Sequence, residues 1–196
     1  MVVSALLGKG PTMLYYAQAL GEAGEGDAGF GDPTRTSIFD YWGIPSLQRW
    51  MTDGRFDGGR LTAREKSLRD FYVKLLSFSA NSPALNGQYA DLHGYNHENT
   101  ANYDEQLFSF SRWNSDEKLV IISNFSDRKD YQFDFRIPDH LISTWSLADG
   151  RYELVDILTD VPNQMLVNQG TGTIQLSLAP LESKIFRMNM TATTPR

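Results

Sequence analysis

Acidic side chains within a glycine-rich segment are the first residues whose chemistry can be considered. Residues 21–32 hold five glycines, with Glu22, Glu25 and Asp27 between them. Two carboxyl groups held a few ångströms apart can act as acid and base, or as acid and nucleophile, in hydrolysis. The glycines favour a loop, because they permit backbone conformations that other residues avoid. We interpret the segment as a solvated acidic loop, with a loop that lines a substrate site as the alternative.

Motifs for metals and cofactors are not found in the sequence. The chain has no cysteine, which removes disulfides, thiol nucleophiles and cysteine-ligated zinc. His93 and His97 are four residues apart, but Gly94 and Asn96 between them argue against a helix. The acidic and amide residues of 96–104 lack the spacing of an EF-hand loop. We therefore predict no metal and no cofactor in this chain.

Charge and composition exclude several classes of partner. The 196 residues carry a net charge of −6, so a nucleic-acid partner is not expected. No stretch approaches the roughly 18 apolar residues of a membrane span. Residues 1–7 are apolar, but Gly8 to Pro11 follow at once and no secretory signal is recognised. The composition is that of a soluble globular protein, and its location stays open.

The first part of the chain, residues 1–82, is expected to hold helices and one strand. The clearest helix is predicted over residues 63–80, with Thr62 as its N-cap and Glu65 completing a capping box. Residues 2–7 and a segment entered through Pro45 are expected to form short helices. The apolar, aromatic run 12–17 predicts a strand buried on both faces.

The second part, residues 85–190, changes to a period of two and predicts antiparallel strands. The expected strands are 107–113, 118–125, 131–137, 152–158, 172–178 and 184–190. The last two are expected to form a closing hairpin through residues 179–183. The fold class is therefore mainly β: an antiparallel Greek-key sandwich that follows a partial (β/α)8-barrel segment with a long helix. Residues 191–196 are expected to be a frayed tail.

Several segments, taken in order, resemble the alpha-amylase family of glycoside hydrolases. The first resembles the eighth barrel strand of that family, although Ala17 and Ala19 stand where the family has Gly and Glu. Others resemble the loop after that strand, the last barrel helix, the "PAL..G" entry to the C-terminal sandwich, and the first and last hairpins of the sandwich. These segments are residues 10–19, 35–50, 66–76, 83–87, 107–126 and 178–186.

The resemblance implies that this chain is a C-terminal portion without the catalytic acids. In the family, a nucleophilic Asp, an acid/base Glu and a second Asp all precede the eighth strand, which here begins at residue 10. A (β/α)8 barrel also needs about 250 residues, more than the chain has. The resemblance implies a periplasmic or extracellular parent that acts on α-glucosidic bonds of starch or maltodextrins, with calcium as a candidate ion of the parent. No catalytic residue is assigned in this chain.

The same resemblance names the residues that would contact the substrate. Phe30, Tyr41 and Trp42 would lie in or near the loop that borders the cleft, where aromatic rings suit the apolar faces of sugars. Arg35 could donate hydrogen bonds to sugar hydroxyls or pair with an acid.

Three roles follow for the chain: an inactive portion of a hydrolase, a module that binds α-glucan without cleaving it, and a structural role in which the sandwich stabilises the rest of the barrel. We favour the structural role for residues 85–190. Because strand 12–17 would lack neighbours, self-association or a rearranged N-terminal region is also expected.

Overall fold

The computed structural model describes residues 1–15, 17–22 and 44–193, and the chain forms two compact units. One unit joins Met1–Lys9 to Phe78–Arg196, and the other is Gly10–Ser77. The assignment of residues 1–82 to a barrel and of 85–190 to a sandwich domain stays a prediction.

The regular elements described in the unit Gly10–Ser77 are all helices or 3-10 turns. It holds the 3-10 turns η1 (Gln18–Leu20) and η2 (Thr52–Gly54), the helix α2 (Pro45–Met51) and most of α3 (Ala63–Asn81). The predicted capping box is present: the Glu65 amide donates to Thr62 Oγ1 (3.3 Å) and the Thr62 amide donates to Glu65 Oε2 (2.8 Å). The predicted long helix is thus confirmed together with its start signal.

The strand predicted over residues 12–17 is wrong in the part that the structure describes. Residues 11–15 form no strand, and Met13 is 82% exposed. Ala17 has a φ of 56°, in the left-handed region. A buried parallel strand needs a neighbour that accepts and donates its backbone hydrogen bonds, and no described strand pairs with this segment.

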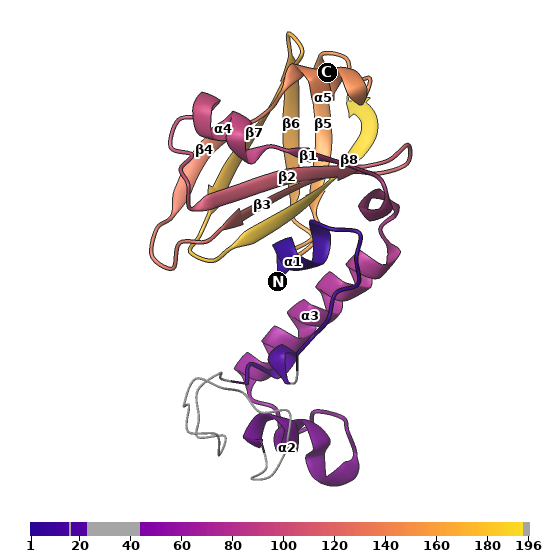
Figure 1. Ribbon diagram of the computed structural model, residues 1–196, viewed down its shortest axis with the longest axis vertical. Helices are drawn as coiled ribbons and strands as arrows, with labels where there is room; N and C mark the ends of the chain where they lie inside the picture. The colour runs from indigo at the N-terminus through magenta and orange to yellow at the C-terminus, as the bar shows by residue number, and fades with distance from the viewer. Residues whose placement is uncertain (16, 23–43, 194–196) are drawn as a thin grey trace. The chain divides into compact units, whose positions relative to one another are not determined.

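The other unit contains one eight-stranded antiparallel sheet that curls on itself (Figure 1). Its strands are β1 (Gln88–Asp91), β2 (Leu107–Trp113), β3 (Lys118–Asn124), β4 (Tyr131–Ile137), β5 (Gly150–Asp156), β6 (Pro162–Asn168), β7 (Thr171–Leu178) and β8 (Ser183–Thr193). The order β1-β2-β3-β8-β5-β6-β7-β4 places β4 beside β7, which gives β4 to β7 a Greek-key arrangement. The predicted mainly antiparallel β fold is confirmed.

Two features of the sheet differ from the expectation. β7 and β8 do not form the predicted hairpin, because β8 lies between β3 and β5 while β7 lies between β6 and β4. β8 also runs to Thr193, which pairs with Arg151 of β5. The four residues between β7 and β8 would permit a hairpin. The strand pairing is therefore decided by which partners complete the sheet rather than by loop length.

The concave side of the sheet encloses the core. β4 shows the cause, since Tyr131, Phe133, Phe135 and Ile137 are buried and the residues between them are exposed. The small helices α4 (His93–Asn99) and α5 (Asp139–Thr144) contact β4 and β7 respectively. On the other side of the sheet, Phe110, Leu119 and Ile121 are also fully buried. The helix α1 (Val2–Leu6) and the 3-10 turn η3 (Pro83–Asn86) belong to this unit as well.

Within residues 1–15, 17–22 and 44–193, none of the helices combines the length and the apolar character needed to cross a membrane.

Candidate functional site

The four predicted substrate contacts, Phe30, Arg35, Tyr41 and Trp42, lie outside the described residues. Of the acidic loop, Glu22 is described, and its carboxylate accepts a hydrogen bond from Ser46 Oγ at 2.7 Å.

Carboxyl groups with a shifted pKa have structural partners in the described part of the chain. Hydrogen bonds from Arg49 above all, and from Thr62, lower the pKa of Glu65 to about 2, against the opposing effect of burial. The Gly59 amide lowers the pKa of Asp57. For Asp104, burial raises the pKa, but hydrogen bonds, chiefly from Lys129, outweigh it and the net direction is down. A general acid needs a raised pKa, so none of these three shifts is that of a general acid.

His93 and His97 lie on the same helix, contrary to the expectation from the sequence, because α4 does form. Carboxylate oxygens of Asp91 accept hydrogen bonds from the His93 and Gly94 amides and cap the helix start. Asn96 is fully buried and its amide donates to the carbonyl oxygen of Leu92. These contacts offset the low helix propensity of the segment. Among the described residues no group of three or more His, Asp or Glu is placed to hold a metal ion.

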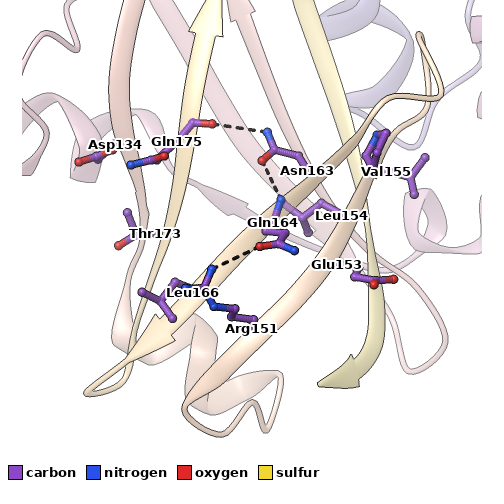
Figure 2. Close-up of a pocket in the computed structure, with 11 residues that line it drawn as sticks. Asp134, Arg151, Glu153, Leu154, Val155, Asn163, Gln164, Leu166, Thr173 and Gln175 are labelled. Atoms are coloured by element: carbon purple, nitrogen blue, oxygen red, sulfur yellow. Dashed lines mark hydrogen bonds between the residues drawn. The ribbon is translucent and has the colours of Figure 1, made fainter. Parts of the chain in front are cut away.

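A polar hollow lies on the outer face of β4, β5, β6 and β7, with a volume of about 760 Å³ (Figure 2). Amide, carboxylate and guanidinium side chains line it, and Arg151 Nη1 donates to Gln164 Oε1 at 3.4 Å. These groups face the same side because alternate residues of a strand share a face. The hollow could donate and accept hydrogen bonds, but it offers no aromatic platform. Its lining is Asp134, Arg151, Glu153, Leu154, Val155, Pro162, Asn163, Gln164, Leu166, Thr173 and Gln175.

A second hollow of about 590 Å³ has the aromatic groups that the first one lacks. The rings of Trp113 and Trp145 meet edge to face there, with centroids 6.0 Å apart and planes at 70°. Lys118 also lines it and is only 5% exposed. Sequence reasoning missed this group, because Trp113 and Trp145 come from strands and helices that are adjacent only in the folded chain.

A cluster of buried polar groups ties the end of α3 to the sheet. Glu117 Oε2 accepts hydrogen bonds from the Ser82 hydroxyl and from the Ala84 amide (3.2 Å). Glu117 Oε1 accepts one from Arg187 Nε at 2.7 Å, and the Arg187 guanidinium lies 5.4 Å from the centre of the Phe78 ring. The carboxylate of Glu117 thus holds Ser82 and the segment 83–85 that follows it.

Arg112 performs a similar task for the first helix. Its side chain is almost fully buried, and Nη1 donates to the Leu7 carbonyl oxygen at 2.7 Å while Nη2 donates to that of Leu85. Carbonyl groups near helix ends lack partners within the helix, and a guanidinium satisfies two at once. Burial lowers the pKa of Arg112. The arginine of the predicted first hairpin strand is therefore a structural anchor.

Gly87 closes this junction at a point where no side chain fits. A Cβ atom there would lie 2.0 Å from the carbonyl oxygen of Trp113, the residue that Gln88 pairs with across the sheet. The glycine of the "PAL..G" segment is thus required by close backbone approach.

Comparison with known proteins gives structural matches only. No protein-family model matches the sequence, and no curated protein sequence matches it significantly. AmyP in complex with maltose aligns with a TM-score of 0.56 at 20% identity, over 95% of this chain and 33% of that chain. An AmyP variant in complex with maltotriose gives 0.54 at 20% identity with the same coverage. The maltogenic alpha-amylase AmyB from Thermotoga neapolitana gives 0.57 at 11% identity, over 95% of this chain and 34% of that chain.

The chain therefore spans about a third of the length of these structural neighbours. The likeness covers both compact units and not the sheet alone, since 95% of this chain takes part. In fold, the chain corresponds to a portion of the alpha-amylase family of glycoside hydrolases.

Proposed function

We propose that this chain is the C-terminal portion of an alpha-amylase-type glycoside hydrolase whose parent acts on α-glucosidic bonds of starch or maltodextrins. The observation that carries the proposal is the structural likeness to AmyP and AmyB over 95% of the chain. The ordered motifs from residue 10 to residue 186 support it. Two of the neighbouring structures hold maltose and maltotriose, which supports an α-glucan as the substrate class of the parent.

The chain by itself is proposed to be inactive. By the family resemblance its catalytic acids would precede residue 10, and the three described carboxyl groups with shifted pKa values are all shifted downward. The test is to incubate the purified 196-residue chain with soluble starch and with maltotriose and to measure new reducing ends. We expect none above a preparation from cells that lack the gene, whereas product formation that follows the chain through purification would contradict the proposal.

The parent itself is tested by the coding sequence upstream of Met1. An open frame that encodes the barrel strands with their Asp, Glu and Asp is the expected result. An in-frame stop codon directly upstream would contradict membership in a longer hydrolase.

The sheet is proposed to stabilise the rest of the parent rather than to act in catalysis. Buried anchors support this role, because Glu117 and Arg112 bind the chain segments that lead into the sheet. A parent variant with Arg112→Met should lose thermal stability and keep its KM for maltotriose. A raised KM at unchanged stability would instead favour a role of the sheet in substrate binding.

The second role, binding of α-glucan without cleavage, is favoured by one specific observation. The hollow beside Trp113 and Trp145 combines aromatic rings with one buried hydrogen-bond donor, Trp145 Nε1, that lacks an acceptor among the described residues.

A further inference from the structure

The hollow of about 590 Å³ is built entirely within the unit that contains the sheet. Gln88 begins β1, Trp113 ends β2 and Lys118 begins β3, and these three are neighbours because Trp113 pairs with Gln88 on one side and with Lys118 on the other. The end of α5 supplies the opposite wall. The volume falls within the range of small-molecule sites, roughly 300–1,000 Å³. Its lining is Gly87, Gln88, Trp113, Asn114, Ser115, Lys118, Thr144, Trp145 and Ser146.

One buried hydrogen-bond donor in this lining has no acceptor among the described residues. Trp145 Nε1 is buried without a partner, and Trp145 as a whole is 3% exposed. Lys118 as a residue is 5% exposed and its ammonium makes no hydrogen bond or salt bridge in the described part of the chain, but the nitrogen itself keeps contact with solvent. Buried donors without acceptors are rare in native proteins, since each costs about 1–3 kcal/mol. An acceptor supplied by a ligand would satisfy Trp145 Nε1, and a second one would replace solvent at the Lys118 ammonium.

Burial lowers the pKa of Lys118, and the nearby charge of Asp116 opposes that effect. The ammonium is therefore partly desolvated, and a hydroxyl or carbonyl oxygen of a ligand can accept a hydrogen bond from it.

The remaining lining defines the chemistry of the ligand. Trp113 is only partly buried, and its ring is held edge to face against Trp145. Asn114 Oδ1 accepts hydrogen bonds from the Asp116 amide (3.0 Å) and the Glu117 amide (2.8 Å), which fixes the turn that carries the polar rim. No acidic residue lines the hollow, which disfavours a cation. Indole rings suit an apolar ring face, and amide and hydroxyl groups suit several hydroxyls on one molecule.

We infer that this hollow binds a pyranose ring of an oligosaccharide, against Trp113 and Trp145 and with Lys118 donating to a sugar hydroxyl. The choice of an α-glucan among oligosaccharides rests on the proposed function, whereas the site itself rests on the hollow.

The test follows the four tryptophan indole N–H signals of the ¹⁵N-labelled chain by NMR during titration with maltotriose. We expect the Trp113 and Trp145 signals to move together with one dissociation constant, near the millimolar range that about −4 kcal/mol of binding free energy gives. The signal of Trp50, in the other unit, should stay fixed. Assignment comes from single Trp→Phe variants.

Variants locate the ligand. Lys118→Met should weaken binding about tenfold or more, as loss of a charged hydrogen bond does. Trp145→Phe keeps the ring, removes the Nε1 donor and should weaken binding several-fold while the Trp113 signal still reports it. The matched control is Lys66→Met, which removes an exposed lysine and should leave the dissociation constant unchanged. Well-dispersed spectra show that each variant is folded.

Several results would overturn the inference. The first is that the two signals do not move with maltotriose, cellotriose or xylotriose up to about 20 mM, well above a millimolar dissociation constant. The second is that they move with inorganic phosphate alone. The third is that binding is lost in Gln164→Ala, which alters the hollow of Figure 2, but is unchanged in Lys118→Met. Movement with cellotriose but not with maltotriose would keep the saccharide site and contradict the α-glucan of the proposed function.

Discussion

Replacement of Gly87 by alanine should destabilise the sheet, and the structure allows the size of the effect to be worked out. The new Cβ would lie 2.0 Å from the Trp113 carbonyl oxygen and 2.7 Å from its carbon, where real Cβ contacts stay at or beyond 3.0 Å. The backbone must therefore move by about 1 Å, and the contact is to backbone rather than to a side chain that could rotate away.

The movement is resisted on both sides of β2. Trp113 pairs with Gln88 of β1 and with Lys118 of β3, so a shift breaks or lengthens one or two backbone hydrogen bonds. Each contributes about 1 kcal/mol, and overpacking adds about 1–3 kcal/mol. The expected loss is about 3 kcal/mol, which moves the urea midpoint down by about 1.5 M for an m-value of about 2 kcal/mol/M.

Urea denaturation of the chain, followed by far-ultraviolet circular dichroism, measures this shift. Gly10→Ala is the matched control, because a Cβ at Gly10 meets nothing within 4 Å. The control should be neutral or slightly stabilising, since alanine restricts the unfolded chain more than glycine does. A midpoint for Gly87→Ala that equals that of Gly10→Ala would refute the reasoning from close backbone approach.

Two further predictions concern buried and capping charges. Arg112→Met should leave the carbonyl oxygens of Leu7 and Leu85 without a donor and lower the free energy of unfolding, measured in urea, by about 2–5 kcal/mol. Arg112→Lys should restore at most part of this free energy, because one ammonium lacks the fork of the guanidinium. Full rescue by lysine would contradict the double anchor. The pKa of Glu65 is lowered in the folded chain, from 4.5 to about 2, so its contribution to stability is present above pH 4.5 and is lost as the pH falls through about 2. Hydrogen exchange at the start of α3 should therefore accelerate across that pH range in the native chain. The change should be smaller in Glu65→Gln, which keeps a cap but not the charge. Equal pH profiles of exchange in the two chains would refute the role of the Arg49 pair.

Local signals in the sequence were enough for elements that are stabilised by their own residues. The capping box of Thr62 and Glu65 marks the start of α3, because both hydrogen bonds join residues three apart. The alternation in residues 131–137 predicts β4 and the face it buries, because side chains of a strand alternate regardless of the partner strand. The segment around Pro83 and Gly87 marked the entry to the sheet, and close backbone approach explains its glycine.

The tertiary structure alone decided which elements meet. Residues 12–15 have the composition of a buried strand, yet a strand exists only where a neighbour supplies hydrogen-bond partners, and none is present among the described residues. α4 forms in spite of Gly94 because a buried Asn96 is held by backbone groups from β4, 40 residues away along the chain.

The two sets of candidate site residues differ in how far the sequence could identify them, again because contacts between distant segments exist only in the folded chain. The predicted contacts from Phe30 to Trp42 rest on sequence order alone and lie outside the described residues. The hollow of Trp113, Lys118 and Trp145 could not be read from the sequence, because Trp145 lies 32 positions beyond Trp113 and reaches it only after α5 has packed on the sheet. What the sequence by itself determined is the chemistry of each segment, since that depends on side chains and near neighbours. Only the folded chain decided which donors remain without acceptors, because burial depends on every element that packs around them.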